Sequence, residues 1–464
     1  MAGLSVEDVV RGTQGALVAG DLGVPVTGIS IDSRTLAIGE AFFAIQGPNR
    51  DGHAFLRDAA ARGAACLVVH NLSDDLPPSV PTILVDDTTR ALGRLAAYHR
   101  ARFAVPVAAV TGSNGKTTTK EMMAAVLEAL GPVLKPEGSF NNQWGLPLTL
   151  LRLRPEHRAL ALELGANTPG EIAALAAISR PTVGAVTVVA SAHTEFFGSL
   201  DGVAAEKSAL VRAIPPDGVV VLNADDPRVL AMHRESRARV LYFSTRPGAD
   251  VFAAGPAEDD GEGLRFTLAA GTARRPVRLQ FAGRHNVVNA LAAAGVGLAL
   301  GLSLEQIARG LEAARPAKGR CVWRRAGRLR ILDDTYNANP TSVSAALATL
   351  AATAGAPRRV VVLGDMLELG AISESAHREM GRAVAASGAA EFIGVGRWAQ
   401  AAVDAARQAG LAESHHVSTF EDTVALLLKR LAPGDAVLVK GSRGMRMERV
   451  VDALVARFGG AGGA

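Results

Sequence analysis

The sequence of 464 residues has few cysteines, few aromatic residues and no long apolar run. Its two cysteines, Cys66 and Cys321, each stand among apolar neighbours, so we expect buried thiols rather than a disulfide. No segment is apolar over enough residues to span a bilayer, and residues 1–8 lack the basic start and apolar core of a secretory signal. These features predict a soluble protein of the cytoplasm, with no membrane span.

The charge distribution argues against a nucleic-acid partner. The formal net charge is only +4, and basic residues are interleaved with acidic ones along the chain. Short pairs such as Arg274-Arg275 and Arg324-Arg325 are typical of solvated surface rather than of a binding tract. Because 48% of the residues are hydrophobic, the chain can build sizeable cores, and its length predicts about two to four domains.

What the sequence does contain is a glycine-rich turn between a predicted strand and a predicted helix. The apolar run 105–110 leads into Thr111-Gly112-Ser113-Asn114-Gly115-Lys116-Thr117-Thr118-Thr119. Such a turn directs backbone N–H groups and a helix N-terminus at one point, where the phosphates of a nucleotide bind. Lys116 is then expected to reach the outer phosphates and Thr117 to bind Mg²⁺, which predicts use of ATP or GTP.

The match to the general phosphate-loop pattern is incomplete. The pattern G-x-x-x-x-G-K-[ST] has a glycine at the position of Val110, so the loop here is the shorter G-x-x-G-K-T. The alternative is a plain glycine turn, which the order of Gly, Lys and Thr at a strand–helix junction disfavours.

The alternation of strands and helices predicts an α/β fold with three domains. We expect a small α/β domain over residues 1–103, a central P-loop ATPase-like domain over 104–316 and a Rossmann-like domain over 317–464. Residues 250–281 are polar and broken by glycine, which predicts an antiparallel insertion. The expected strands are 28–32, 41–45, 66–69 and 82–85, then 107–110, 159–164, 183–189, 219–223 and 240–243, then 329–332, 360–363, 392–395 and 437–439.

Polar residues follow several of these strands. Glu163 ends a strand, and in a parallel sheet that edge faces the same crevice as the phosphate loop, so its carboxylate suits Mg²⁺ beside a γ-phosphate. An ordinary helix-capping acid is the alternative. His193 lies past the next strand at the same edge, although a lone histidine is more often structural.

Three further clusters stand at predicted strand–helix junctions. Asn286 and Asn289 share one helical face and either cap the helix or contact a purine. The dense polar tract 333–340 contains Asp334 and Asn337 and ends at Pro340, so it is either a site or a capping turn. Ser442 and Arg443 lie on a glycine turn that could bind an anion.

Taken together, these segments resemble the Mur ligase family over nearly the whole chain. The resemblance rests on 111–119, on 141–150, on 163–170, on 193–207, on 285–289 and on 440–443. The tract Tyr-Asn-Ala-Asn-Pro at 336–340 and Leu-Gly-Asp-Met-Leu-Glu-Leu-Gly at 363–370 resemble the branch that adds D-alanyl-D-alanine. The motif Asp-Asn-Pro-Arg, typical of the sister branch that adds the third residue, is absent at the corresponding place.

The resemblance implies a role for each domain. The first domain would hold the UDP end of the substrate, the second would bind ATP and Mg²⁺, and the third would hold the incoming dipeptide. It assigns nucleotide contacts to Thr111, Gly112, Ser113, Asn114, Gly115, Lys116, Thr117 and Thr118, the base region to Asn286 and Asn289, and the ribose side to Asp334 and Asn337. Substrate contacts fall to Ser33, Arg34, Asp51, His53, Ser442 and Arg443.

It also implies a reaction. The terminal carboxylate of UDP-MurNAc-tripeptide attacks the γ-phosphate of ATP, and the amine of D-alanyl-D-alanine then attacks the acyl phosphate to give UDP-MurNAc-pentapeptide. The metal ligands would be Thr117, Glu163, His193 and Lys207, with Lys207 carbamylated by CO₂, and Arg320 would reach back to the γ-phosphate. A monomer is expected, and the identity of the third peptide residue, diaminopimelate or lysine, stays open.

Two other functions compete with this one. Folylpolyglutamate synthase shares the loop and the two-domain core, but such an enzyme would start near its phosphate loop, whereas here about a hundred residues precede it. A nucleotide-gated binding protein would not need Glu163, His193 and Lys207 together at one crevice.

Overall fold

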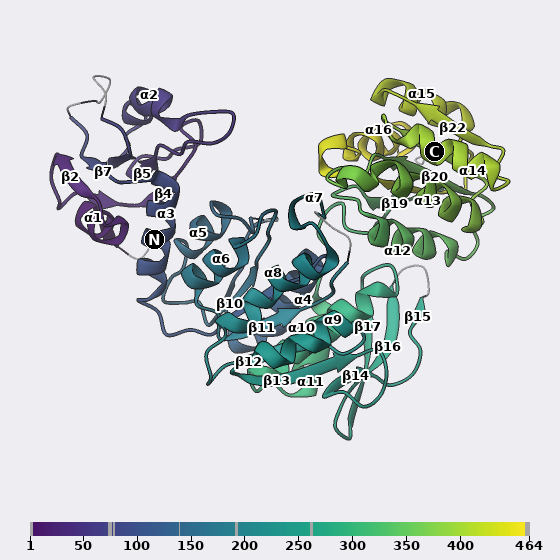
Figure 1. Ribbon diagram of the computed structural model, residues 1–464, viewed down its shortest axis with the longest axis horizontal. Helices are drawn as coiled ribbons and strands as arrows, with labels where there is room; N and C mark the ends of the chain where they lie inside the picture. The colour runs from purple at the N-terminus through teal and green to yellow at the C-terminus, as the bar shows by residue number, and fades with distance from the viewer. Residues whose placement is uncertain are drawn as a thin grey trace.

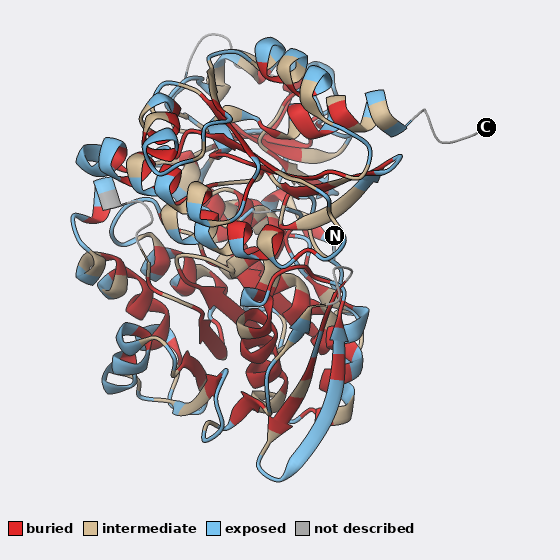
Figure 2. Ribbon diagram, turned by 90° about the vertical axis from the view of Figure 1, so that its right-hand side faces the viewer, coloured by how far each residue is buried: buried red, intermediate tan, exposed pale blue. Residues whose placement is uncertain are grey.

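The computed structural model describes residues 3–72, 77, 79–138, 140–190, 194–259 and 263–459. They form three lobes in chain order, with the N-terminal and C-terminal lobes on opposite sides of the central one (Figure 1). Each lobe is built on its own sheet. Buried residues follow these sheets, and exposed ones cover the outer helices (Figure 2).

The N-terminal lobe has a five-stranded sheet in the order β2-β7-β6-β5-β4, in which β2 is antiparallel to its neighbour and the others are parallel. Its last helix, α3, packs against α1 within the lobe and against α5 and α6 of the central lobe. The elements are β1 (Leu4–Ser5), α1 (Val6–Thr13), β2 (Ala16–Ala19), β3 (Pro25–Val26), β4 (Gly28–Ser30), β5 (Glu40–Phe43), η1 (Gly52–Phe55), α2 (Leu56–Ala61), β6 (Cys66–Val69), β7 (Thr82–Leu84) and α3 (Thr88–Arg100).

The central lobe has a ten-stranded sheet whose core strands run parallel in the order β13-β12-β11-β8-β10-β9. These strands are β8 (Val107–Thr111), β9 (Val133–Leu134), β10 (Ala159–Glu163), β11 (Val183–Val186), β12 (Val219–Asn223) and β13 (Arg239–Ser244). They are short, almost wholly apolar runs because both faces of a parallel sheet are covered.

Two groups of helices cover this sheet. On one face α4 (Lys116–Leu127), α10 (His285–Ala299) and α11 (Leu304–Ala313) share an apolar core with the strands. On the other face lie α5 (Gly145–Leu150), α6 (Glu171–Ser179) and α8 (Leu200–Ala213), whose core continues into α3. The shorter elements are η2 (Glu128–Leu130), α7 (Thr194–Phe197), α9 (Pro227–Ala231) and η3 (Met232–Glu235).

The segment expected to be an antiparallel insertion instead extends the central sheet. Strand β14 (Val251–Ala253) pairs parallel with β13, and only then do β16 (Leu264–Ala270) and β17 (Ala273–Leu279) add antiparallel strands, with β15 (Glu258–Asp259) at the edge. The expectation was therefore right for the hairpin and wrong for the strand that joins it to the sheet.

The C-terminal lobe has a six-stranded sheet in the order β18-β19-β23-β20-β21-β22, parallel except for the edge strand β18. Helices α12, α13 and α14 cover one face, and α15 and α16 cover the other. The elements are β18 (Val322–Ala326), β19 (Leu329–Asp334), α12 (Pro340–Ala351), β20 (Arg359–Gly364), η4 (Gly370–Ile372), α13 (Ser373–Ala386), β21 (Glu391–Val395), α14 (Ala399–Gln408), β22 (Ser414–Val417), α15 (Phe420–Arg430), β23 (Ala436–Lys440), η5 (Arg443–Met445) and α16 (Glu448–Gly459).

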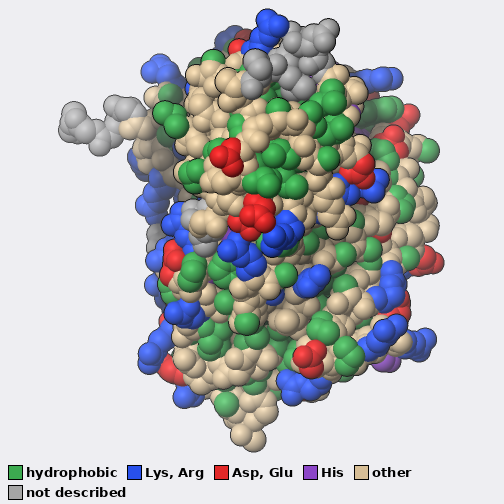
Figure 3. Space-filling model, turned by 90° about the vertical axis from the view of Figure 1, so that its left-hand side faces the viewer, with side chains coloured by type: hydrophobic (Ala, Val, Ile, Leu, Met, Phe, Trp, Pro, Cys, Tyr) green, Lys and Arg blue, Asp and Glu red, His purple; other side chains and the backbone are tan. Residues whose placement is uncertain are grey.

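The surface agrees with the even charge of the sequence. On the face that Figure 3 presents, Lys and Arg side chains are spread over the surface with Asp and Glu scattered among them. Both cysteines are buried free thiols, as expected. Within the described ranges, no helix has the length and apolar character needed to cross a bilayer.

Candidate active site

The phosphate loop connects β8 to the N-terminus of α4. Gly115 caps the helix with φ +83°, and a Cβ at this position would lie 2.2 Å from Asn289 Oδ1. Gly112 has φ +148°, and a Cβ there would lie 2.0 Å from Thr187 Oγ1. Both positions therefore require glycine, for conformation and for space. The first turn of α4 presents its N–H groups to an open cavity, as an anion site does.

Side chains of the loop and of the neighbouring strand fix the loop's shape. Thr111 Oγ1 donates to the carbonyl of Leu164, and Thr187 Oγ1 donates to the carbonyl of Asn114 at 2.6 Å. Ser113 Oγ exchanges hydrogen bonds with the backbone of Ala190, as donor at 3.0 Å and acceptor at 2.9 Å. The hydroxyls of Thr111 and Ser113 therefore hold the loop.

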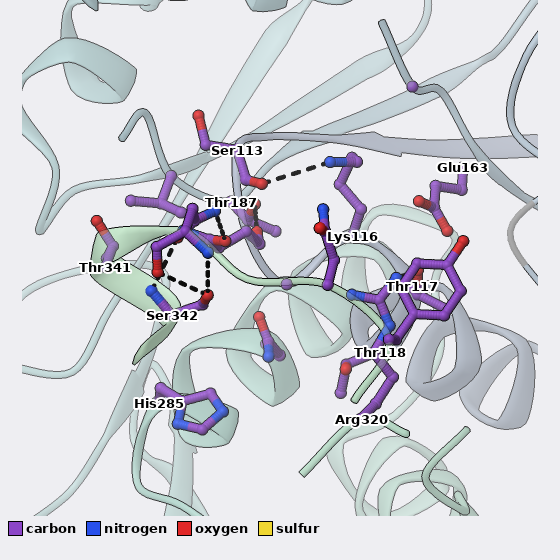
Figure 4. A pocket seen from close by; sticks show the side chains of 18 of the residues that line it. Ser113, Lys116, Thr117, Thr118, Glu163, Thr187, His285, Arg320, Thr341 and Ser342 are labelled. Carbon is purple, nitrogen blue, oxygen red and sulfur yellow. Dashed lines mark hydrogen bonds between the residues drawn. The ribbon is translucent and has the colours of Figure 1, made fainter. Parts of the chain in front are cut away.

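Lys116 and Glu163 lie on the same side of the site, with the amine of Lys116 directed to the carbonyls of the loop (Figure 4). Lys116 Nζ donates to the carbonyl of Gly112 at 2.9 Å. Burial lowers the pKa of Lys116 below its usual value, and the charge of Glu163 offsets only part of that shift. Glu163 ends β10 and is 1% exposed; its Oε1 accepts from Asn141 Nδ2 at 2.7 Å, whereas its Oε2 has no hydrogen-bond partner within the described part of the chain.

Lys207 is a buried lysine on α8, 3% exposed. Its Nζ lies 5.7 Å from the centre of the Phe197 ring and has no hydrogen-bond or ion-pair partner among the residues described. Burial, with the charge of Lys116 acting in the same direction, lowers the pKa of Lys207 to about 7. The adjacent Glu206 is structural, because both of its carboxylate oxygens accept from backbone N–H groups at the start of α6.

Two asparagines of α10, Asn286 and Asn289, lie next to the phosphate loop. Asn289 Oδ1 accepts from Thr119 Oγ1 at 3.3 Å, and Asn289 Nδ2 donates to Asn286 Oδ1 at 2.8 Å. Asn286 Nδ2 in turn donates to the carbonyl of Ala282 at 2.7 Å. Both side chains line the cavity, yet their amides already bind protein groups, and Asn289 lies directly against Gly115.

Arg320 reaches from the start of the C-terminal lobe to the loop (Figure 4). Its Nη2 donates to Thr117 Oγ1 at 3.0 Å, and its guanidinium carbon lies 3.8 Å from the centre of the Tyr336 ring. Its Nε is buried without a hydrogen-bond partner among the described residues. A cation from one lobe therefore lies at the hydroxyl expected to bind Mg²⁺ in another.

A second contact joins the same two lobes. Asn339 caps α12, and its Nδ2 donates to Asn114 Oδ1 at 2.8 Å, while Asn114 Nδ2 donates to Asn339 Oδ1 at 3.4 Å. Asn114 is part of the phosphate loop, so this amide pair couples the loop to the position of the C-terminal lobe.

The ends of β19 and β23 complete that side of the cavity. Asp334 Oδ2 pairs with Lys440 Nζ at 2.5 Å, and Asp334 Oδ1 accepts from the backbone N–H of Cys321 at 3.1 Å. Lys440 Nζ also donates to the carbonyl of Asn337 at 2.8 Å. Asn337 Oδ1 accepts from the N–H of Ala338 at 2.9 Å, so this turn is locally ordered.

A smaller cavity of about 110 Å³ opens beside the first in the C-terminal lobe. Ser442 lines it but is structural, because its Oγ accepts from the N–H of Leu367 at 2.8 Å. Arg443 lines both cavities and donates to Glu448 at 3.1 Å. Glu368, also on this wall, has φ +62°, a conformation that is rare outside glycine and clusters at functional sites.

The four residues expected to bind the UDP end lie in the N-terminal lobe and do not line the main cavity. Arg34 is exposed and pairs with Asp32 at 2.6 Å, and the neighbouring Ser33 is buried. His53 Nδ1 lies 2.7 Å from Asp51 Oδ1. Burial raises the pKa of Asp51, but hydrogen bonds from His53 outweigh it and the net shift is downward.

The main cavity measures about 1000 Å³, at the upper end of the range for ligand sites, roughly 300–1000 Å³. It contains most of the expected nucleotide residues, but Thr111 and Gly112 do not line it, and neither does Lys207, the expected metal ligand. His193 lies outside the described residues. Within the ranges that the structure describes, His, Cys, Asp and Glu side chains form no group of three or more around a metal position.

Comparison with known proteins identifies the family. Family models match three successive stretches: the Mur ligase family catalytic domain at residues 25–100, the Mur ligase middle domain at 110–297 and the Mur ligase glutamate ligase domain at 319–443. The UDP-N-acetylmuramoyl-tripeptide–D-alanyl-D-alanine ligase of Escherichia coli (strain K12) is 39% identical over 445 residues, covering 93% of this chain and 94% of the relative. This chain belongs to the Mur ligase family.

Solved Mur ligase structures share the whole architecture. A crystal structure of MurF from Acinetobacter baumannii has a TM-score of 0.90 at 35% identity and covers 98% of this chain and 99% of that one. The MurF ligase of Thermotoga maritima, solved in complex with ADP, has a TM-score of 0.81 at 27% identity and covers 93% of this chain and 97% of that one. The three-domain α/β organisation and the family resemblance are thereby confirmed.

Sequence reasoning missed several contributors to this Mur ligase site. No role was expected for Asn141, Thr187, Tyr336 or Asn339, although each lines the cavity. Asn141, Tyr336 and Asn339 stand inside the segments that carry the family resemblance, which was the available signal. Thr187 has no local signal, because its contact with the loop comes only from the pairing of β11 with β8.

Proposed function

We propose that this Mur ligase is an ATP-dependent amide ligase that adds D-alanyl-D-alanine to UDP-MurNAc-tripeptide, forming UDP-MurNAc-pentapeptide, ADP and phosphate for peptidoglycan. The full-length similarity to relatives of that name supports the substrate pair. It includes the N-terminal lobe whose presence disfavours a folate enzyme. The observation that best supports the site is the hydrogen bond from Arg320 to Thr117, because it brings a cation of the C-terminal lobe to the phosphate loop.

The first step brings two anions together, so charge neutralisation dominates its barrier. The substrate carboxylate attacks the γ-phosphorus, the bond to ADP breaks, and an acyl phosphate forms. Lys116 and Arg320 supply two positive charges at the loop, and the start of α4 directs its N–H groups to the same place. Rigid tethers of the loop keep these donors in position before the reaction.

The residues present fit Mg²⁺. The buried Oε2 of Glu163 lacks a hydrogen-bond partner among the described residues, and the hydroxyl of Thr117 lies at the head of the loop. Thr117 and Glu163 would hold the ion, with His193 and Lys207 expected to complete its site. When bound, Mg²⁺ neutralises phosphate charge. Because Oε1 of Glu163 is fixed by Asn141, Oε2 is left pointing to a defined position.

Lys207 suits carbamylation by its own environment. With a pKa of about 7, a large fraction of its amine is neutral near neutral pH and can attack CO₂. The new N–C bond converts the amine to a carbamate, and a proton leaves to solvent. The carbamate is an anion near Lys116, whereas the protonated amine would be a second cation repelled by it.

The second step belongs to the C-terminal lobe. We place the acceptor dipeptide at the smaller cavity, with Arg443 toward its carboxylate and its amine toward the phosphate loop. The amine attacks the acyl carbon and loses a proton to solvent, and the tetrahedral intermediate collapses to the amide as the C–O bond to phosphate breaks. Ser33, Arg34, Asp51 and His53 would hold the UDP end in the N-terminal lobe, so the substrate would span two lobes.

Domain limits of 1–103, 104–316 and 317–464 accompany this proposal. Each of the four sheets of the described residues, the two-stranded β1-β3 pair included, lies wholly inside one of these ranges, which supports them. The dependence on ATP favours a reaction in the cytoplasm.

The test is product formation with purified protein, ATP, Mg²⁺ and UDP-MurNAc-tripeptide, with and without D-alanyl-D-alanine. Phosphate release that needs both substrates, with UDP-MurNAc-pentapeptide identified by mass, supports the proposal. Release with a folate acceptor and glutamate, or none with either pair, contradicts it. Lys116→Met removes one positive charge from the loop, and phosphate release should fall sharply in this variant.

A further inference from the structure

Tyr336 has two arginines over its ring. The guanidinium carbon of Arg320 lies 3.8 Å from the ring centre and that of Arg443 lies 5.6 Å away. All three residues line the main cavity. The two cations come from different segments, one just before β18 and the other just after β23, so only the fold brings them to one aromatic ring.

An aromatic ring is a suitable support for cations that must bind anions. The face of the ring carries partial negative charge and attracts a guanidinium within about 6 Å. A guanidinium that lies over a ring keeps the N–H donors at its edge free for a planar or tetrahedral anion. Two arginines lining one cavity repel each other, and the shared ring offsets part of that repulsion.

The contacts of Arg320 agree with this. One edge nitrogen donates to Thr117 in the phosphate loop, while Nε is buried with no hydrogen-bond partner in the described part of the chain. The Tyr336 ring lies against the face of this guanidinium, and Nη2 at its edge reaches Thr117 of the phosphate loop. Arg443 Nη1 donates a hydrogen bond to Glu448, and Arg443 lines both cavities.

Tyr336 is itself held firmly. Its N–H donates to the carbonyl of Gly319 at 3.0 Å. Gly319 has φ +72°, and a Cβ at this position would lie 3.3 Å from Tyr336 N. The residue before it, Thr335, donates to Asp333 at 2.6 Å. These bonds fix the backbone at Tyr336, two residues past the end of β19, against the segment that carries Arg320.

We infer that Tyr336 is a positioning residue that aligns Arg320 with the transferring phosphate and Arg443 with the carboxylate of the incoming dipeptide. The inference rests on the proposed function. It adds that one residue, Tyr336, supports both the arginine at the transferring phosphate and the arginine at the dipeptide carboxylate. Tyr336 acts through the arginines, so its loss weakens both anion contacts at once.

The experiment compares Tyr336→Leu, Tyr336→Phe and the parent enzyme with two acceptors, D-alanyl-D-alanine and D-alanyl-D-alaninamide. The amide lacks the carboxylate that Arg443 would bind. We expect the parent to use the acid better than the amide, Tyr336→Leu to lose roughly tenfold in kcat/KM with the acid, and the gap between acceptors to shrink. Tyr336→Phe keeps the ring and should restore most of both quantities.

Phe420→Leu is the matched control. Arg449 lies 4.0 Å from the centre of the Phe420 ring on the far helices of the same lobe, so this change removes an arginine-bearing ring away from the cavity. We expect its kinetic constants and its preference for the acid to equal those of the parent. A purely structural loss in Tyr336→Leu would lower activity equally with both acceptors.

The outcomes separate this inference from the proposed function. If the parent forms no product from D-alanyl-D-alanine, the proposed function is wrong. If the parent is active and Tyr336→Leu keeps the parent's preference for the acid, the inference is wrong. Should Tyr336→Leu fail to fold, Arg443→Gln decides, because it must lose the preference for the acid, and a parent-like preference overturns the inference.

Discussion

Replacing Gly115 by alanine tests the account of the phosphate loop. Gly115 has φ +83°, where a side chain costs about 1–2 kcal/mol. The new Cβ would lie 2.2 Å from Asn289 Oδ1, so Asn289 must move and lose its bonds with Thr119 and Asn286. At about 0.5–1.5 kcal/mol for each bond, the displacement adds about 1–3 kcal/mol.

Gly170 provides a matched control. It is also a helix-capping glycine, with φ +91° and ψ −10° against +83° and −10° for Gly115, but a Cβ there meets nothing within 4 Å. Gly170→Ala should therefore lose only the stability that a side chain at positive φ costs, and Gly115→Ala should be destabilised by about 1–3 kcal/mol more. Native-state hydrogen exchange measures both losses, in the amides of α4 and α10 for Gly115→Ala and in those of α6 for Gly170→Ala.

The double variant Gly115→Ala/Asn289→Ala completes the test. Asn289→Ala removes the oxygen that the new methyl group meets, so the double variant should be less destabilised than the sum of the two single ones. Equal losses for Gly115→Ala and Gly170→Ala, or strict additivity in the double variant, would refute the steric argument.

Three further predictions concern other parts of the site. Burial lowers the pKa of Lys207 to about 7. Between that pH and the ordinary value of 10.5, the unfolded chain binds more protons than the folded one, so the free energy of unfolding rises with pH. Thermal unfolding measured against pH should show this slope in the CO₂-free parent and not in Lys207→Met. Gly444→Ala adds a methyl group 2.9 Å from Leu367 Cδ1 in the smaller cavity, and steady-state kinetics should show KM for the dipeptide raised roughly tenfold and KM for ATP unchanged. Asn339→Ser keeps a helix cap but loses the bond to Asn114, so kcat should fall roughly threefold to tenfold with an unchanged melting temperature, and an unchanged kcat would contradict a coupling role.

The sequence predicted the strands that lie inside the sheets. The apolar runs at 107–110, 159–164 and 219–223 became β8, β10 and β12, because a buried parallel strand must be apolar on both faces. The edge strands β2, β18 and β22 were not expected. β18 reads Val-Trp-Arg-Arg-Ala, and its two arginines hide the strand pattern that pairing with β19 imposes.

The candidate site was predictable where a motif fixes local geometry. Lys116, Thr117 and Glu163 lie where the strand–loop–helix order and the strand end place them. The contacts that cross between lobes were not predictable in this way. Asn114 meets Asn339 from 225 positions away, and Arg320 meets Thr117 from 203 away, so these pairs depend on how two lobes pack.

The central claim is that the tripeptide carboxylate is activated as an acyl phosphate at this loop. The direct measurement uses UDP-MurNAc-tripeptide with ¹⁸O in its terminal carboxylate, together with ATP, Mg²⁺ and D-alanyl-D-alanine. Attack on the γ-phosphorus places one carboxylate oxygen in the bridge, and amide formation releases it with phosphate. The account predicts one ¹⁸O in each phosphate formed alongside pentapeptide; phosphate without ¹⁸O would contradict it.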